Sequence, residues 1–385
     1  MKKLLMILEF ASLVWLCSSS FAATEYVIVN NGNYISNSAI LYKLNTKTGK
    51  LSKMAVLRTG GQADMYENYL AQVEQAITHD AGCIFVFDDG SSDIAAFSKA
   101  TGYKRVGDYF DQNLIAGQVG GTLALTPDGN FLYGSYGFTS NIGAWRVNSD
   151  CTLAFVSTYV VSYDFGPIKV TPNGKFLVAS SNVADYAYLF AIDKATGVLT
   201  AIGGVAFTGG ACARITYCEP HGFDITKDSK FVVFGSNAVD IRRQHSLPVA
   251  LTARITSTGL VNPHVWVLKN SANLVSAIFP FFGAAAYAGS GDLYFGVWAS
   301  GGPPGVLTTH FTESPLSFTV TNATVVDPEV ANIAVTGNVM VVAQPPDQIG
   351  VFRIQKNGSL KLLSTTTIDE QGEGLFSLSI FPNTR

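Results

Sequence analysis

The stretch LALTPDGNFLYGSYG, at residues 123–137, predicts two antiparallel strands joined by a tight turn. Apolar residues alternate with others on both sides of the Thr-Pro-Asp-Gly sequence, and this period of two is typical of strands. Proline fixes the backbone angle that a β-turn needs, and glycine tolerates a positive φ. The stretch therefore reads as a β-hairpin.

The same pattern recurs along the chain, about 45 to 65 residues apart, which indicates a repeat architecture. Clear copies are IKVTPNGKFLVASSN at 168–182 and FDITKDSKFVVFGSN at 223–237, and weaker ones lie at 75–89, 284–298 and 333–344. A second hairpin follows the copies, as in AYLFAIDKATGVLTAIG at 187–203. Each unit is thus four antiparallel strands, which is the blade of a β-propeller.

The two ends of the repeat region complement each other. EYVIVNN, at 25–31, matches the second strand of a unit that lacks its first, and LFSLSIFPN, at 375–383, matches a first strand with nothing after it. Joining them completes a seventh blade and removes the strand edges that an open sheet would expose. We therefore predict an all-β, seven-bladed propeller closed by its C-terminal strand. The long insertions at 60–74, 204–220 and 239–263 read as loops or extended hairpins.

The first 23 residues have the pattern of a secretory signal peptide. Lys2 and Lys3 precede an apolar run at 4–16, and small residues follow at the positions that signal peptidase reads. The run is shorter than the roughly 20 residues that a membrane span needs, and Cys17 leaves a lipoprotein signal as an alternative. We expect a signal peptide at 1–23, one propeller domain at 24–385, and a secreted or periplasmic protein.

Composition excludes several classes of partner. The net charge is −3, 14% of residues are charged and 48% are hydrophobic, and basic residues form no run longer than a pair such as Arg242-Arg243. Nucleic acid is therefore not an expected partner, and neither is stable insertion into a membrane. We expect a monomer that binds a small anionic molecule or an envelope or extracellular protein.

Four cysteines remain after removal of the signal segment, and export favours their pairing. Cys212 and Cys218 lie close together in one loop, so a disulfide between them is predicted. A Cys83–Cys151 disulfide is not expected, because the repeats place these residues in different blades; the alternative is two buried thiols.

The TPDG-x-FLY repeats and the TG-x-L hairpins resemble those of the lactonase-type seven-bladed propellers. That group includes 6-phosphogluconolactonases, carboxymuconate cyclases and YVTN-repeat proteins. The resemblance covers nearly all of the chain after the signal segment, but the motifs that carry it specify turns and packing rather than chemistry. It implies a histidine, arginines and a glutamate near the mouth of the central channel.

The residues that match this expectation surround Pro220-His221, at the start of an innermost strand. We predict His221 and Glu219 as the catalytic pair, with Arg214, Arg242 and Arg243 binding the substrate. The alternative is that His221 satisfies a loop carbonyl and that the arginines are solvated. The loop that begins at Asp88 lacks the ligand order of a calcium site, and neither metal-ligand spacing nor a phosphate-binding glycine loop is found. No metal or cofactor is expected.

Two functions remain open. The first is an exported lactonase-like hydrolase or cyclase that acts on a small anionic lactone at the channel mouth. The second is a non-catalytic propeller that binds a ligand or protein in the envelope or outside the cell.

Overall fold

The computed structural model describes most of the chain after the predicted signal segment. The described residues are 25–33, 35–63, 76–88, 90–111, 121–136, 140–160, 165–181, 184–213, 218, 220–240, 245–268, 279–288, 291–300, 303–327, 329–368 and 377–381. The predicted signal peptide at 1–23 lies outside them.

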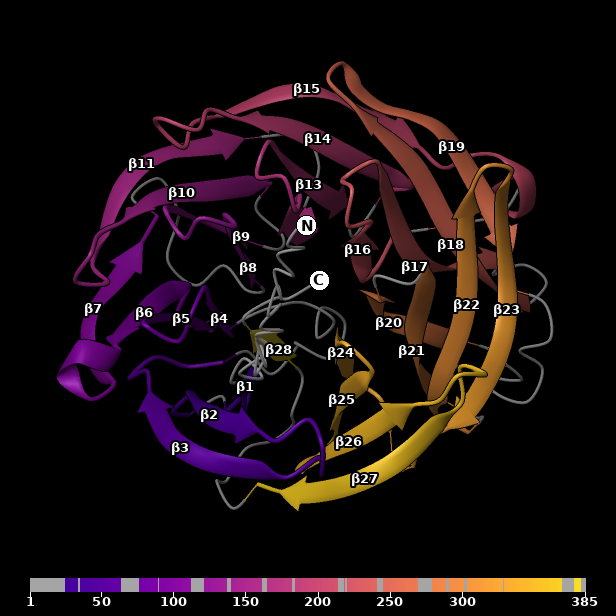
Figure 1. Cartoon of the computed structure of the whole chain (residues 1–385). Helices are drawn as coiled ribbons and strands as arrows, with labels where there is room; N and C mark the ends of the chain where they lie inside the picture. Colours follow the sequence, from indigo (N-terminus) through magenta and orange to yellow (C-terminus); the bar gives the residue numbers. More distant parts are fainter. Residues whose placement is uncertain are drawn as a thin grey trace, which may run out of the picture.

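The described residues form seven four-stranded antiparallel sheets, arranged as blades around one axis (Figure 1). From its innermost to its outermost strand, blade 1 contains β28 (Ser377–Phe381), β1 (Glu25–Asn30), β2 (Ser38–Leu44) and β3 (Leu51–Arg58). In the same order, blade 2 contains β4 (Ala76–Thr78), β5 (Cys83–Asp88), β6 (Asp93–Ser98) and β7 (Lys104–Phe110). Blade 3 contains β8 (Gly121–Leu125), β9 (Phe131–Tyr136), β10 (Asn141–Val147) and β11 (Leu153–Val160).

The remaining four blades follow the same order. Blade 4 contains β12 (Phe165–Val170), β13 (Phe176–Ser181), β14 (Tyr186–Ile192) and β15 (Leu199–Ala206). Blade 5 contains β16 (Phe223–Ile225), β17 (Phe231–Asp240), β18 (His245–Thr256) and β19 (Gly259–Val267). Blade 6 contains β20 (Phe279–Ala288), β21 (Asp292–Ser300), β22 (Gly305–Glu313) and β23 (Leu316–Val325). Blade 7 contains β24 (Asn332–Thr336), β25 (Val339–Gln344), β26 (Gln348–Ile354) and β27 (Leu360–Thr367). Within the described residues, two short 3-10 helices, η2 (Lys99–Thr101) and η3 (Gly210–Cys212), lie in connections.

The two ends of the chain close the ring, as predicted. β28 pairs antiparallel with β1 over five residues, from Tyr26↔Phe381 to Asn30↔Ser377. Figure 1 shows β28 as the innermost strand of the blade that also holds β1, β2 and β3. Blade 1 is therefore assembled from the two ends of the repeat region.

The Thr-Pro-Asp-Gly repeats form the turns that their composition predicts. Gly129 has φ +73° and donates its N–H to the Thr126 carbonyl at 2.8 Å. The Thr126 hydroxyl donates to the Asp128 carboxylate at 2.7 Å and accepts the Phe131 N–H at 3.0 Å. The side chains of the repeat therefore satisfy the polar backbone groups that the reversal leaves unpaired.

The apolar core lies between neighbouring blades. The rings of Phe87 and Tyr136 are 5.2 Å apart between blades 2 and 3, and those of Tyr159 and Phe190 are 4.8 Å apart between blades 3 and 4. Edge-to-face pairs of this kind are favourable beyond the apolar area that they bury. Contacts between aromatic side chains thus help to pack neighbouring blades against each other.

The strand order gives the ring two different faces. Turns that join first to second strands and third to fourth strands lie on one face, which we call the turn face. Connections from second to third strands, and from one blade to the next, lie on the opposite loop face. Of the predicted site residues, His221 belongs to the loop face, directly before β16.

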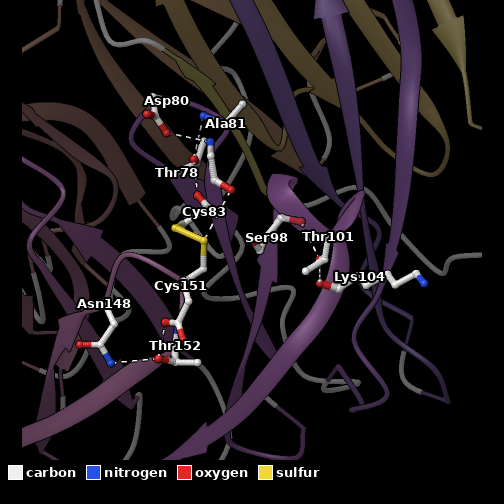
Figure 2. Close-up of a disulfide and its surroundings, with 12 residues drawn as sticks. Thr78, Asp80, Ala81, Cys83, Ser98, Thr101, Lys104, Asn148, Cys151 and Thr152 are labelled. Atoms are coloured by element: carbon white, nitrogen blue, oxygen red, sulfur yellow. Dashed lines mark hydrogen bonds between the residues drawn. A yellow bond between two sulfur atoms is a disulfide. The ribbon is translucent and has the colours of Figure 1, made fainter.

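The structure corrects one cysteine prediction. Cys83 and Cys151 form a disulfide with a Cα–Cα distance of 5.2 Å (Figure 2). Cys83 begins β5 of blade 2, and Cys151 lies in the turn between β10 and β11 of blade 3. The prediction placed them correctly in different blades, but these blades are neighbours whose turns meet on the turn face. The expectation that they would not pair was wrong.

Candidate functional site

On the loop face, Pro220 and His221 lie directly before the innermost strand of blade 5, β16. The His221 N–H donates to the Gly235 carbonyl at 3.0 Å, and the Gly235 N–H donates to the Gly222 carbonyl at 3.0 Å. These two bonds extend the β16–β17 ladder beyond Phe223, so the backbone of His221 is fixed to the rigid part of blade 5. The structure thus places His221 at the start of an innermost strand, where the sequence predicts it.

The environment of His221 determines its charge. Its side chain is partly buried, and burial lowers the pKa of the imidazole to about 4. Desolvation disfavours the charged form of a histidine, whose usual pKa is about 6.5. The imidazole is therefore neutral near pH 7 and able to accept a proton.

The other predicted site residues are not placed. Glu219, Arg214, Arg242 and Arg243 lie outside the described residues, and their roles stay predictions. The predicted Cys212–Cys218 disulfide is present, with a Cα–Cα distance of 5.6 Å. It closes the loop that contains Arg214 and ends three residues before His221.

Two acidic residues of the loop face, Asp88 and Asp93, are buried and hydrogen-bonded. Asp88 is fully buried and accepts a hydrogen bond from the Asn37 side-chain amide of blade 1 at 2.7 Å. Burial raises the pKa of Asp93, while the hydrogen bond from the Ser91 hydroxyl counteracts the rise. Within the described residues, no group of three or more metal-binding side chains is placed to hold an ion.

Sequence reasoning missed a charged crosslink on the turn face. The Lys169 ammonium of blade 4 contacts the Asp224 carboxylate of blade 5 at 3.2 Å, and Asp224 also accepts the Tyr287 N–H of blade 6 at 2.8 Å. The sequence contains a feature that could have indicated this ion pair. Lys169 and Asp224 occupy the same repeat position, where a clear copy and a weaker one have Ala124 and Ala334.

This crosslink lies in the wall of a cavity of about 350 Å³. The walls come from the turn-face ends of innermost strands in six blades, including Ile77, Leu125 and Ile225. Lys169 and Asp224 neutralise each other, so this pair presents little net charge to a ligand. We interpret the cavity as the turn-face end of the central axis and the ion pair as a clamp between blades.

Comparison with known families agrees with the fold. Two overlapping segments, residues 107–215 and 163–265, match the model of a family described as lactonase, seven-bladed β-propeller. The second segment contains β16 and His221. A search of the curated proteins found no match.

Solved structures share the architecture over nearly the whole chain. A candidate 6-phosphogluconolactonase from Bacteroides fragilis is 14% identical, with a TM-score of 0.67 over 94% of this chain and 99% of that one. A second candidate 6-phosphogluconolactonase, from Bacteroides uniformis, is 12% identical, with a TM-score of 0.67 over 93% and 99%. A protein from Lactobacillus plantarum is 13% identical, with a TM-score of 0.69 over 93% and 99%. Identities this low show the fold alone.

The chain is a seven-bladed β-propeller. The family match confirms the resemblance to the lactonase-type propellers over residues 107–265, and the solved structures share the seven-bladed fold. Its two disulfides indicate an oxidising, non-cytoplasmic environment. Among the described residues, no helix has the length and apolar character of a membrane span.

Proposed function

We propose that this chain is an exported lactonase-like enzyme that opens or closes a small anionic lactone at the centre of the loop face. The observation that carries the proposal is the neutral imidazole of His221, fixed at the loop-face end of β16 inside the segment that matches the lactonase family.

The chemistry requires one proton acceptor and one proton donor. In hydrolysis, water adds to the lactone carbonyl while His221 accepts its proton, and the ring C–O bond then breaks. The imidazolium returns the proton to the departing alkoxide, which leaves a hydroxy acid. The arginines at 214, 242 and 243 are proposed to hold the anionic group of the substrate, because a guanidinium binds carboxylate or phosphate with two parallel hydrogen bonds.

The test is a panel of a neutral, a carboxylated and a phosphorylated sugar lactone. Wild type should hydrolyse at least one of the anionic lactones, and His221→Ala should lower kcat/KM by about 100-fold or more, as expected for loss of a general base. His264→Ala is the matched control, because His264 is exposed on the outermost strand of the same blade. Binding without turnover by wild type would overturn the proposal in favour of a non-catalytic binding propeller.

The pH profile provides a second test. A base with an ordinary histidine pKa would lose activity as the pH falls through about 6.5. Because the pKa of His221 is about 4, kcat/KM should stay level below neutral pH and fall only as the pH approaches 4. A fall centred near pH 6.5 would contradict the assignment of His221 as the base.

A further inference from the structure

The segment that leads into His221 is tied to blade 4 by Asp185. Asp185 lies in the connection before β14, on the loop face. Its backbone carbonyl accepts the Phe207 N–H at 2.8 Å, and its carboxylate accepts the Cys218 N–H at 2.6 Å. Burial raises the pKa of the Asp185 carboxyl, and the hydrogen bond from Cys218 lowers it again in part. One residue therefore holds the connection from blade 4 to blade 5 near both of its ends.

The Cys212–Cys218 disulfide closes the same segment from within. Both cysteines are buried, at 5% and 0% exposure, in the cluster that contains Phe207 and Phe234. The η3 helix, which ends at Cys212, packs beside the outermost strand β19. The sulfur atoms are thus covered by two blades, so the disulfide is a fixed link rather than an accessible thiol switch.

The distance along the chain from this link to His221 is short. Three peptide units separate Cys218 from His221, which limits their Cα atoms to a separation of about 11 Å. On its other side, His221 is fixed by the hydrogen bond to Gly235. If Cys218 moves, the three peptide units between it and His221 must therefore change conformation, or the His221 imidazole must move as well.

We propose that Asp185 and the Cys212–Cys218 disulfide form a positioning unit that holds His221 in the orientation that its role requires. The proposal rests on the function proposed above. Asp185 and the two cysteines act through the backbone and do not touch the substrate. The competing explanation is that these groups only stabilise the fold, and the experiment must separate the two.

The first readout is the titration of His221, followed by the NMR signals of the five histidine imidazoles and assigned by loss of one signal in His221→Gln. In wild type the pKa should lie near 4. In Asp185→Ala and in Cys212→Ala/Cys218→Ala, a looser segment admits water, so the pKa should rise by at least one unit toward the ordinary value of about 6.5. Asp185→Asn retains an oxygen acceptor for the Cys218 N–H and should restore most of the wild-type value.

The molecule supplies its own control for the disulfide. Cys83→Ala/Cys151→Ala removes the link on the turn face, between two other blades, and should leave the His221 titration within about 0.3 units of wild type. The proposal is overturned if the positioning variants leave the titration unchanged, or if the control variant shifts it equally.

Kinetics provide the second readout and separate this proposal from the function on which it rests. With an active wild type, the positioning variants should lower kcat about 10-fold or more and change KM less, as expected when a general base is misplaced. Unchanged kcat in folded variants would contradict positioning. If wild type hydrolyses no lactone, the proposed function fails while the titration still decides whether the unit positions His221.

Discussion

The two disulfides of this propeller join regions of very different kinds. Cys83–Cys151 spans 68 residues and links two neighbouring blades on the turn face, whereas Cys212–Cys218 spans six residues within one connection on the loop face. The first bond constrains the architecture of the ring. The second constrains a short segment beside the proposed site. We therefore expect the first link to serve the stability of the ring and the second to serve the geometry of the proposed site.

Blade 1 shows what a non-covalent closure contributes. It is held together by the pairing of β28 with β1, and Leu378 and Phe381 are buried there, at 1% and 2% exposure. No disulfide joins β28 to its neighbours among the described residues. Within the described residues, a disulfide thus links blades 2 and 3, whereas strand pairing and packing close the ring at blade 1.

The largest effect should follow from removal of this closing strand. Deletion of residues 377–385 exposes the edge of β1 and the core that β28 covers, so we expect loss of cooperative folding rather than a trimmed tail. Circular dichroism and urea titration should show no cooperative transition. Deletion of 382–385 alone is the control and should retain it. A 377–385 deletion with the wild-type midpoint would show that the ring does not need its closing strand.

A large but smaller effect should follow from loss of the turn-face disulfide. Cross-linking across 68 residues removes enough entropy from the unfolded chain to contribute about 4 kcal/mol to the free energy of unfolding. Cys83→Ala/Cys151→Ala should therefore lower the free energy of unfolding by about that amount, as measured by urea titration under non-reducing conditions, while the protein still folds. A loss below about 1 kcal/mol would contradict this account and show that residual structure in the unfolded chain already keeps the two cysteines close, so that the cross-link removes little entropy.

The sequence allowed the architecture to be predicted because propeller signals are local. Alternation, the Thr-Pro-Asp-Gly turns and the complementary ends each occupy a short stretch, and strand counting then determines the closure. The Cys212–Cys218 disulfide was predictable for the same reason, since the short loop alone brings its ends together.

The features that were missed depend on contacts between blades. The pairing of Cys83 with Cys151 requires knowing that the turn after β10 reaches the start of β5 in the neighbouring blade. The clamp formed by Lys169 and Asp224 likewise depends on which side chains of adjacent innermost strands meet. The sequence correctly placed His221 at the start of an innermost strand. The low pKa of the His221 imidazole, however, arises from burial in the folded protein. The sequence of a single repeat does not reveal which residues of a neighbouring blade it will contact.

The smallest expected loss of stability belongs to the loop-face disulfide, and it bears most directly on the different roles of the two links. Loop-closure entropy grows with the logarithm of loop length, so a six-residue link should contribute about 2 kcal/mol, roughly half the contribution of the longer one. Cys212→Ala/Cys218→Ala should accordingly lower the free energy of unfolding by about 2 kcal/mol in the same urea titration. The two double variants should therefore rank in opposite orders for the loss of stability and for the displacement of the His221 titration. If Cys212→Ala/Cys218→Ala proved the more destabilising variant while His221 titrated as in wild type, the loop-face link would hold the fold and not the site. The hypothesis that the turn-face disulfide stabilises the ring while the loop-face disulfide positions His221 would then be wrong.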